Sequence, residues 1–245
     1  TNFMLSILIP VRNESESLRD IAEYFSKNLT NIIYEIIIIN DFSDDDTLEK
    51  ARTLFQDKKN FKVIDNKKKG LGGAINLGIK EAQGINLVIM MADRSDDIKD
   101  LINYNNLMNS GNYDAILGSR FLPESIISEY PFRKLVLNRL FNYFVGLIFF
   151  NKYNDYTNAF KIYKKEVLME IRPLISESFN IFLEIPLKII SRKYRYKIVP
   201  INWIGRKKGS SKFKIKELGA KYLFTLIYCF IEKNLLNIKK WNLLL

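Results

Sequence analysis

The chain has 245 residues, 47% of them hydrophobic, which suffices for one large core or at most two small domains. It contains no histidine, and this excludes a Ser-His triad, histidine ligands to zinc and a histidine general base. Cys229 is the sole cysteine, so no disulfide can form within the chain.

Charge is distributed unevenly along the chain, whose net charge is +11. Residues 1–122 contain 15 Lys and Arg against 18 Asp and Glu, whereas residues 123–245 contain 23 against 9. A basic half of this kind indicates an anionic partner such as a phosphate group, nucleic acid or an acidic lipid surface; a merely solvated basic face is the alternative. Nucleic acid is disfavoured, because the acidic half carries the candidate site and no aromatic RNA-binding motif occurs.

The first 120 residues predict alternating strands and helices, which is typical of an α/β fold with a mostly parallel central sheet flanked by helices. The expected strands span 4–10, 34–39, 61–64, 86–91 and 113–117, and the expected helices span 16–27, 47–55, 74–82 and 98–108. Ligands of such sheets bind at the carboxyl ends of the strands. The loops after Ile9, Ile39 and Met91 are therefore the first places to look for a site.

Beyond Phe121 the pattern changes. A long aromatic helix is expected over 132–150, a strand over 158–163, a helix over 179–191, a strand over 196–203 and a Gly-, Ser- and Lys-rich loop over 205–214. We expect one domain over residues 1–215, followed by a C-terminal amphipathic helix and tail over residues 216–245. The most apolar stretches, Leu140–Phe150 and Leu218–Ile231, are shorter than the ~20 residues of a spanning helix, so they are not expected to cross a membrane. Lying on a membrane surface and packing into the core are equal alternatives for the first stretch, and the surface is favoured for the second.

The loop after the first expected strand contains Pro10, Asn13 and Glu14. Asn13 and Glu16, three residues apart, have the spacing of a helix capping box, so Asn13 is expected to be an N-cap. The same loop can also line a site, because it follows a strand at its carboxyl end.

The loop after the second long strand, residues 40–47, is rich in carboxylates. Some of them are explained by their favourable interaction with the N-terminus of the next helix. Asp41 differs, because it follows the buried strand almost directly and its carboxylate can accept hydrogen bonds from a ribose or a base.

Residues 67–73 combine three lysines with a glycine-rich turn before an expected helix. The turn is neither a Walker loop nor a Rossmann fingerprint. It does offer close backbone approach and positive charge at a helix N-terminus, which suit a diphosphate.

The loop after Met91 contains Asp93 and Ser95. A carboxylate at a strand end among oxygen-bearing neighbours suits Mg²⁺ or Mn²⁺, which bridge a protein carboxylate and a diphosphate. Capping of the next helix is the alternative role for these carboxylates, and Asp96 or Asp97 is better placed for it.

In this order, the four loops resemble the inverting glycosyltransferase family with the GT-A fold. The nearest branch comprises the dolichol-phosphate mannose synthases and other polyprenyl-phosphate glycosyltransferases. In the first half, the matching residues are Pro10, Asn13, Glu14, Asp41, Ser43, Asp45, Thr47, Gly70–Ala74 and Ala92–Ser95, with Asn40 replacing the first Asp of one motif. In the second half they are Gly118–Phe121, Asp155–Phe160, Phe182, Glu184, Val199, Pro200 and Arg206–Lys212. The resemblance places Phe182 and Glu184 on a helix that closes the acceptor side.

The resemblance implies transfer of a hexose, with inversion, from a nucleoside-diphosphate sugar of the GDP-mannose or UDP-glucose type to a polyprenyl or dolichyl phosphate. The residues expected to hold the donor are Pro10, Arg12, Asn13, Glu14, Asp41, Ser43, Lys69, Gly70 and Ala92. The residues expected to act in catalysis and on the acceptor phosphate are Asp93, Arg120, Arg133, Arg206 and Lys212.

Asp93 and Ser95 are expected to hold Mg²⁺ or Mn²⁺. Met91 stands where the family's metal motif has its first Asp, and a thioether is a poor ligand for a hard cation. The site is therefore expected to bind metal more weakly, and a member without turnover remains an alternative.

The expected location is cytoplasmic, peripheral on the inner face of the membrane, because lysines flank the apolar C-terminal stretch and favour an anionic surface. A soluble or surface glycan is the alternative acceptor.

Overall fold

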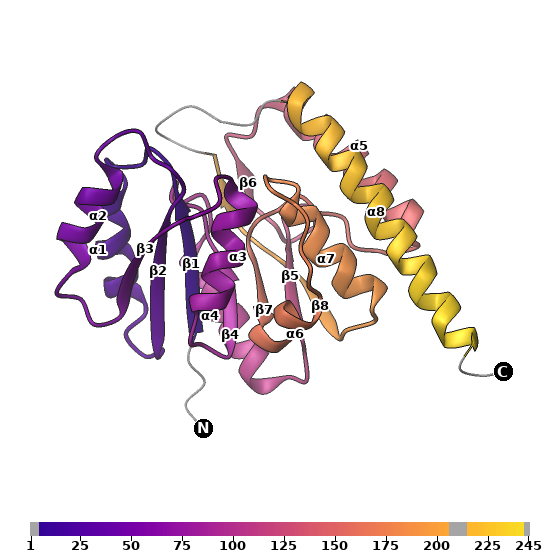
Figure 1. Cartoon of the computed structure of the whole chain (residues 1–245), viewed down its shortest axis with the longest axis horizontal. Helices are drawn as coiled ribbons and strands as arrows, with labels where there is room; N and C mark the ends of the chain where they lie inside the picture. The colour runs from indigo at the N-terminus through magenta and orange to yellow at the C-terminus, as the bar shows by residue number, and fades with distance from the viewer. Residues whose placement is uncertain (1–4, 206–214, 243–245) are drawn as a thin grey trace.

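The computed structural model describes residues 5–205 and 215–242, the last helix in backbone only at 215–218 and 237–242. Its centre is a seven-stranded sheet in the order β3-β2-β1-β4-β7-β5-β8 (Figure 1). The strands are β1 (Leu5–Val11), β2 (Tyr34–Asn40), β3 (Phe61–Asp65), β4 (Asn86–Ile89), β5 (Ala115–Ser119), β7 (Lys161–Lys164) and β8 (Tyr196–Pro200). All neighbouring strands are parallel except where β7 pairs antiparallel with β4 and β5. A separate pair joins β6 (Ile127–Ser128) and β9 (Trp203–Ile204).

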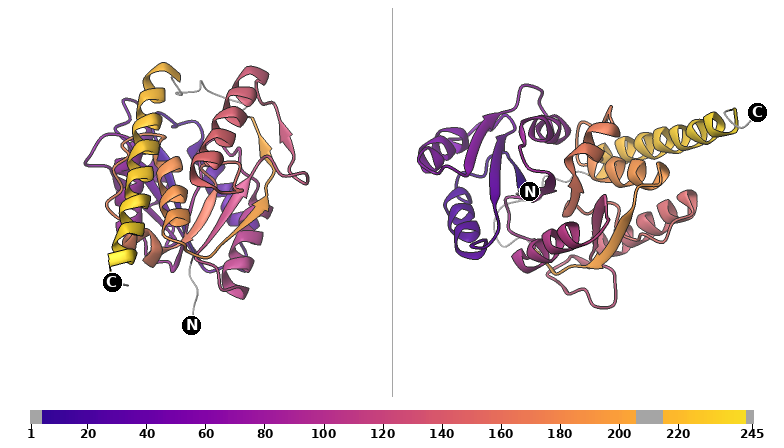
Figure 2. Two further views of the ribbon diagram at one scale, coloured as in Figure 1. Left: turned by 90° about the vertical axis from the view of Figure 1, so that its right-hand side faces the viewer. Right: turned by 90° about the horizontal axis from the view of Figure 1, so that it is seen from below.

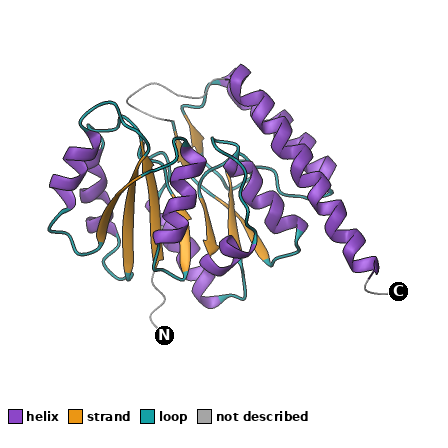
Figure 3. Ribbon diagram, in the orientation of Figure 1, coloured by secondary structure: helices purple, strands orange, loops and turns teal. Residues whose placement is uncertain are grey.

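Helices cover both faces of the sheet (Figures 2 and 3). They are α1 (Leu18–Asn28), α2 (Thr47–Phe55), α3 (Leu71–Glu81), α4 (Ile98–Ser110), α5 (Phe132–Phe149), α6 (Lys165–Glu170), α7 (Ile181–Ser191) and α8 (Ile215–Asn242). The run Ile36–Ile39 shows why the sheet is buried on both sides. Ile37 and Ile39 pack into a core with α3, α6 and α7, whereas Ile36 and Ile38 pack into a second core with α1, α2 and α4. A continuous β-branched run therefore supplies both cores at once.

Each predicted strand and helix is present, but several ends differ. The first helix starts at Leu18 and its N-cap is Ser17, so the prediction that Asn13 caps it is wrong. Asn13 instead has a left-handed backbone with φ of 52° and belongs to the preceding loop. The short helix α6 and the strand pair β6–β9 were not predicted, because elements of two to six residues leave no clear periodicity.

The 28-residue helix α8 packs on α7 and also contacts α5 through edge-to-face pairs of aromatic rings. Figure 1 shows α5 and α8 along the right-hand side of the molecule, with α8 starting near the end of the sheet where β1 finishes. In the described ranges, no helix combines the length and the apolar character that crossing a bilayer requires.

Candidate active site

Hydrogen bonds join the loops after β1 and β2 at the carboxyl edge of the sheet. The backbone N–H of Asn13 donates to Ser43 Oγ at 3.0 Å, and Asn13 Oδ1 accepts from the N–H of Asp44 at 2.8 Å. The N–H of Glu14 donates to the hydroxyl of Thr47 at 2.9 Å. Because β1 lies between β2 and β4, the loop after β4 opens at the same edge.

Each of these three loops contains one non-glycine residue with a left-handed backbone. The φ angles are 52° at Asn13, 54° at Phe42 and 55° at Arg94. Such conformations are uncommon outside glycine and concentrate at functional sites, where the surrounding structure enforces them. Their repetition at three adjacent strand ends marks this edge as the candidate site.

Asp41 connects the first two loops to a fourth one, before α3. Its carboxylate is almost fully buried, and Oδ1 accepts from the N–H of Gly70 at 2.7 Å and from Asn66 Nδ2 at 2.9 Å. Gly70 has a φ of 119°, and a Cβ there would lie 2.4 Å from Glu177 O, so only glycine fits this turn. Asp41 thus fixes the glycine turn before α3.

Asp93 organises the loop after β4. Its Oδ1 accepts from the N–H of Ser95 at 3.2 Å and from Ser95 Oγ at 2.8 Å. Asp97 caps α4, as predicted, by accepting from the N–H of Lys99 at 2.9 Å. Burial, together with the negative charge of Asp93, raises the pKa of Asp96 to about 7. The loop therefore holds two carboxylates in different environments beside the sheet edge.

The residues present fit a divalent cation held by one protein carboxylate. Within the described part of the chain, no group of three or more acidic or cysteine side chains could hold a metal ion. Mg²⁺ commonly takes only one or two protein carboxylates and completes its shell with water and phosphate oxygens. Asp93 meets this requirement by itself, whereas Met91 packs its side chain against the core.

Arg120, at the end of β5, is buried in an ion pair. Its Nε and Nη2 donate to Asp155 Oδ2 and Oδ1 at 2.9 and 2.7 Å. The guanidinium also lies over the rings of Phe121, Tyr130 and Trp203, at 5.4, 5.6 and 5.8 Å from their centroids. Asp155 and the three rings hold Arg120 in one orientation. Burial alone would lower the pKa of Arg120, but the negative charge of Asp155 and its hydrogen bonds raise it.

The profile of the family described as Glycosyl transferase family 2 matches residues 6–172, about two thirds of the chain. The chain belongs to glycosyl transferase family 2.

Two named proteins are similar in sequence to this family 2 member. The Dolichol-phosphate mannosyltransferase of Pyrococcus furiosus is 33% identical over 222 residues, which are 87% of this chain and 60% of that protein. The Polyprenol monophosphomannose synthase of Mycolicibacterium smegmatis is 26% identical over 233 residues, which are 88% of this chain and 86% of that protein. The chain thus spans only about three fifths of the Pyrococcus protein's length.

A solved structure confirms the GT-A fold of this family 2 chain. It is glucosyl-3-phosphoglycerate synthase from Mycobacterium tuberculosis, in complex with Mn²⁺, uridine-diphosphate and phosphoglyceric acid. The TM-score is 0.71 at 13% identity, over 93% of this chain and 78% of that one. At this identity the likeness shows the fold alone.

The family 2 fold brings most of the predicted donor residues together. Pro10 lies buried in β1, Ala92 is buried beside Asp93, and Arg12 forms a long ion pair with Asp44 at 4.0 Å. Lys69 is exposed in the loop before α3. Arg133 is exposed in the first turn of α5. Arg206 and Lys212 lie outside the described residues.

Three residues around the candidate site were not assigned their interactions from sequence. Asn66 holds Asp41 and the glycine turn, Asp155 holds Arg120, and the charge of Asp93 acts on the pKa of Asp96. The first two contacts span 25 and 35 residues, so no local spacing reveals them. Asp155 could have been singled out from sequence, because it is the first residue of the matching stretch Asp155–Phe160.

Proposed function

We propose that this chain transfers a hexose from a nucleoside-diphosphate sugar to a polyprenyl phosphate, with inversion at the anomeric carbon. The observation that carries the proposal is that hydrogen bonds join the loops of Asn13, Asp41 and Gly70 at the carboxyl edge of the sheet, where the loop of Asp93 also opens. The printed names of the two relatives supply the acceptor class.

The reaction proposed is a single displacement. A phosphate oxygen of the acceptor forms a bond to the anomeric carbon while the bond from that carbon to the donor diphosphate breaks, and the diphosphate leaves with the electron pair. A phosphate acceptor is already ionised near neutral pH, so no histidine base is needed. The chain's contribution is then alignment and stabilisation of charge on the leaving group.

The donor is held by the loops at the sheet edge. Asp41 is proposed to accept hydrogen bonds from the nucleoside, and the N-terminus of α3, which follows the Gly70 turn that Asp41 fixes, is proposed to meet the diphosphate. Lys69 adds a positive charge in the same loop. Asp93 and Ser95 would hold Mg²⁺ or Mn²⁺ there, and such an ion supplies neutralisation of the leaving diphosphate.

The acceptor phosphate needs cations, and we propose Arg133, Arg206 and Lys212 for contact with it. Arg120 has a different place in the proposal, because two of its nitrogens already bind Asp155 inside an aromatic enclosure. It is proposed to act from there as a fixed charge beside the reacting groups.

The acceptor's hydrocarbon chain requires an apolar surface, and α5 and α8 offer one. Large apolar side chains stand exposed along one stripe of each helix: Phe132, Val136, Leu137, Leu140, Tyr143, Phe144 and Leu147 on α5, and Leu223, Phe224, Ile227, Phe230, Ile231 and Leu235 on α8. Lys221 is exposed beside the second stripe. Apolar stripes with flanking cations are typical of helices that lie in a membrane interface, so we propose peripheral attachment there, at the cytoplasmic face.

Donor binding is expected to raise the melting temperature. At a ligand concentration about 100 times Kd, the matching nucleoside diphosphate adds about 2.7 kcal/mol, or roughly 5–11 °C for a chain of this size. Thermal shift with GDP, UDP and their sugars, with and without Mn²⁺, measures it. Extraction after incubation with labelled sugar nucleotide and polyprenyl phosphate should then recover labelled lipid. Label confined to the aqueous phase favours a soluble acceptor, and binding without any transfer favours a non-catalytic member.

Vesicle flotation is expected to depend on the α8 stripe. Replacing Phe224 and Ile227 by Gln should reduce the fraction bound to phosphatidylcholine–phosphatidylserine vesicles about tenfold, because less apolar area is buried. Ile33 and Ile85 are exposed elsewhere, so their replacement by Gln is the matched control. Raising salt from about 0.05 to 0.5 M should weaken only the electrostatic part. Equal flotation of both variants would contradict the proposed attachment.

A further inference from the structure

Glu184 is a fully buried carboxylate in the first turn of α7. Its Oε1 accepts from the backbone N–H of Ile175 at 2.9 Å, and its Oε2 accepts from that of Ser176 at 2.8 Å. Lys188, one turn further on, places its ammonium 3.1 Å from the same carboxylate. One side chain therefore clamps two consecutive amides of the segment before α7, with its charge balanced inside the protein.

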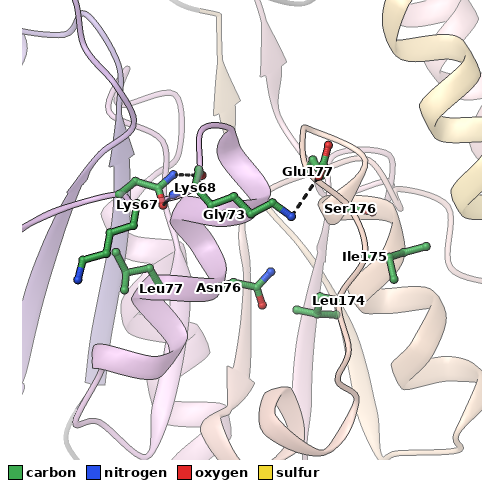
Figure 4. Close-up of a pocket in the computed structure, with 10 residues that line it drawn as sticks. Lys67, Lys68, Gly73, Asn76, Leu77, Leu174, Ile175, Ser176 and Glu177 are labelled. Atoms are coloured by element: carbon green, nitrogen blue, oxygen red, sulfur yellow. Dashed lines mark hydrogen bonds and ion pairs between the residues drawn. The ribbon is translucent and has the colours of Figure 1, made fainter.

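The opposite side of that segment presses on the start of α3. The N–H of Gly72 donates to Glu177 O at 3.1 Å, and a Cβ on Gly72 would lie 1.8 Å from Ser176 O. Lys68 also pairs with the Glu177 carboxylate at 3.1 Å. Figure 4 shows Ser176 and Glu177 facing Lys68 and Gly73. These four residues line a pocket whose volume is about 230 Å³. The segment is thus held between Glu184 on one side and the glycine turn on the other.

The glycine turn at Gly70 also contacts Asp41, because the N–H of Gly70 donates to the Asp41 carboxylate. A continuous series of contacts runs from Glu184 through the backbone of residues 175–177 to the first turn of α3 and to Asp41. We infer that Glu184 is a positioning residue for the donor site, setting the place of the α3 N-terminus without touching the donor. This inference rests on the proposed binding of a nucleoside diphosphate at that turn.

The resemblance had assigned Glu184 to the acceptor side. Its two amide contacts give it a different partner, the segment that borders the glycine turn. The same ionic network provides a matched comparison, because Glu232 on α8 pairs with Lys188 at 3.4 Å and Arg192 at 2.5 Å. Glu232 therefore belongs to the same ionic network as Glu184. Its carboxylate pairs with cations of Lys188 and Arg192, whereas that of Glu184 binds the backbone of Ile175 and Ser176.

The test compares Glu184→Gln with Glu232→Gln in the full chain. Calorimetric titration uses GDP and UDP with Mn²⁺, and the nucleotide that binds the wild type serves as probe. The Gln side chain in Glu184→Gln has one oxygen and can accept a hydrogen bond from only one of the two backbone amides. We therefore expect its Kd for the nucleotide to be about tenfold higher than that of the wild type, whereas the Kd of Glu232→Gln should stay within about twofold of it. Both variants should lower the melting temperature, so thermal stability alone does not separate them. Equal Kd values for the two variants would overturn the inference, and absence of binding by the wild type would count against the proposed function instead.

Two further measurements keep the inference testable if Glu184→Gln folds poorly. In Gly72→Ala the new methyl group pushes against residues 176–177 from the side opposite Glu184. The double variant Gly72→Ala with Glu184→Gln should therefore raise Kd by clearly less than the two single effects combined. In the wild type, nucleotide should slow hydrogen exchange at the amides of Ile175 and Ser176, because coupling is reciprocal. Additive effects, or unchanged exchange at both amides, would overturn the inference.

Discussion

Replacing Asp93 by Asn is expected to lower the transfer rate roughly a hundredfold and to abolish its response to Mn²⁺, because the site loses the carboxylate proposed to hold the ion against the leaving diphosphate. The substitution keeps the shape of the side chain and an oxygen for the bonds from Ser95. Steady-state rates across an Mn²⁺ titration measure the effect.

Asp97→Asn is the matched control for Asp93. It lies in the same loop, four residues on, and caps α4 through the N–H of Lys99. Because Asn is also a good N-cap, this variant should keep both its stability and its metal response. Met91→Asp should shift the response toward lower Mn²⁺ concentration by adding a charged ligand. Identical titrations for wild type, Asp93→Asn and Met91→Asp would remove the metal assignment.

Asp155→Asn is expected to destabilise the fold by about 3–5 kcal/mol, because it leaves Arg120 as a buried charge without its counterion. Urea denaturation measures the free energy of unfolding. Asp20→Asn is the control, since both side chains of its ion pair with Arg94, at 2.9 Å, are more than 40% exposed and the pair should contribute less than about 1 kcal/mol.

The double variant Asp155→Asn with Arg120→Met separates the ion pair from simple packing. With the cation gone, no charge is left uncompensated, so the double variant should be more stable than Asp155→Asn alone. Equal losses from Asp155→Asn and Asp20→Asn would mean that water reaches the pair and that Arg120 is not held as described.

Sequence periodicity predicted the sheet and its larger helices because their signals are local. A run such as Ile36–Ile39 fits only a strand covered on both faces. The same logic located the loops after β1, β2 and β4, since parallel strands end at one edge.

Sequence did not predict the contacts that give those loops their form. Asn13 looked like a helix cap, but its left-handed backbone turns its side chain toward the next loop, where Asp44 meets it 31 residues away. Arg120 looked like a free phosphate ligand, and its burial against Asp155 depends on where β7 and the preceding loop lie in the sheet. Such pairs depend on tertiary packing, which short-range spacing does not encode.

The antiparallel insertion of β7 has a consequence for how the chain folds. The loops proposed to hold the donor end by residue 97, yet one edge of β4 is paired only by residues 161–164, which bridge it to β5. An open central edge exposes unpaired backbone groups and invites wrong pairing. A fragment of the first hundred residues would therefore leave β4 with an open edge. The acidic and basic halves, so different in charge, share one central sheet.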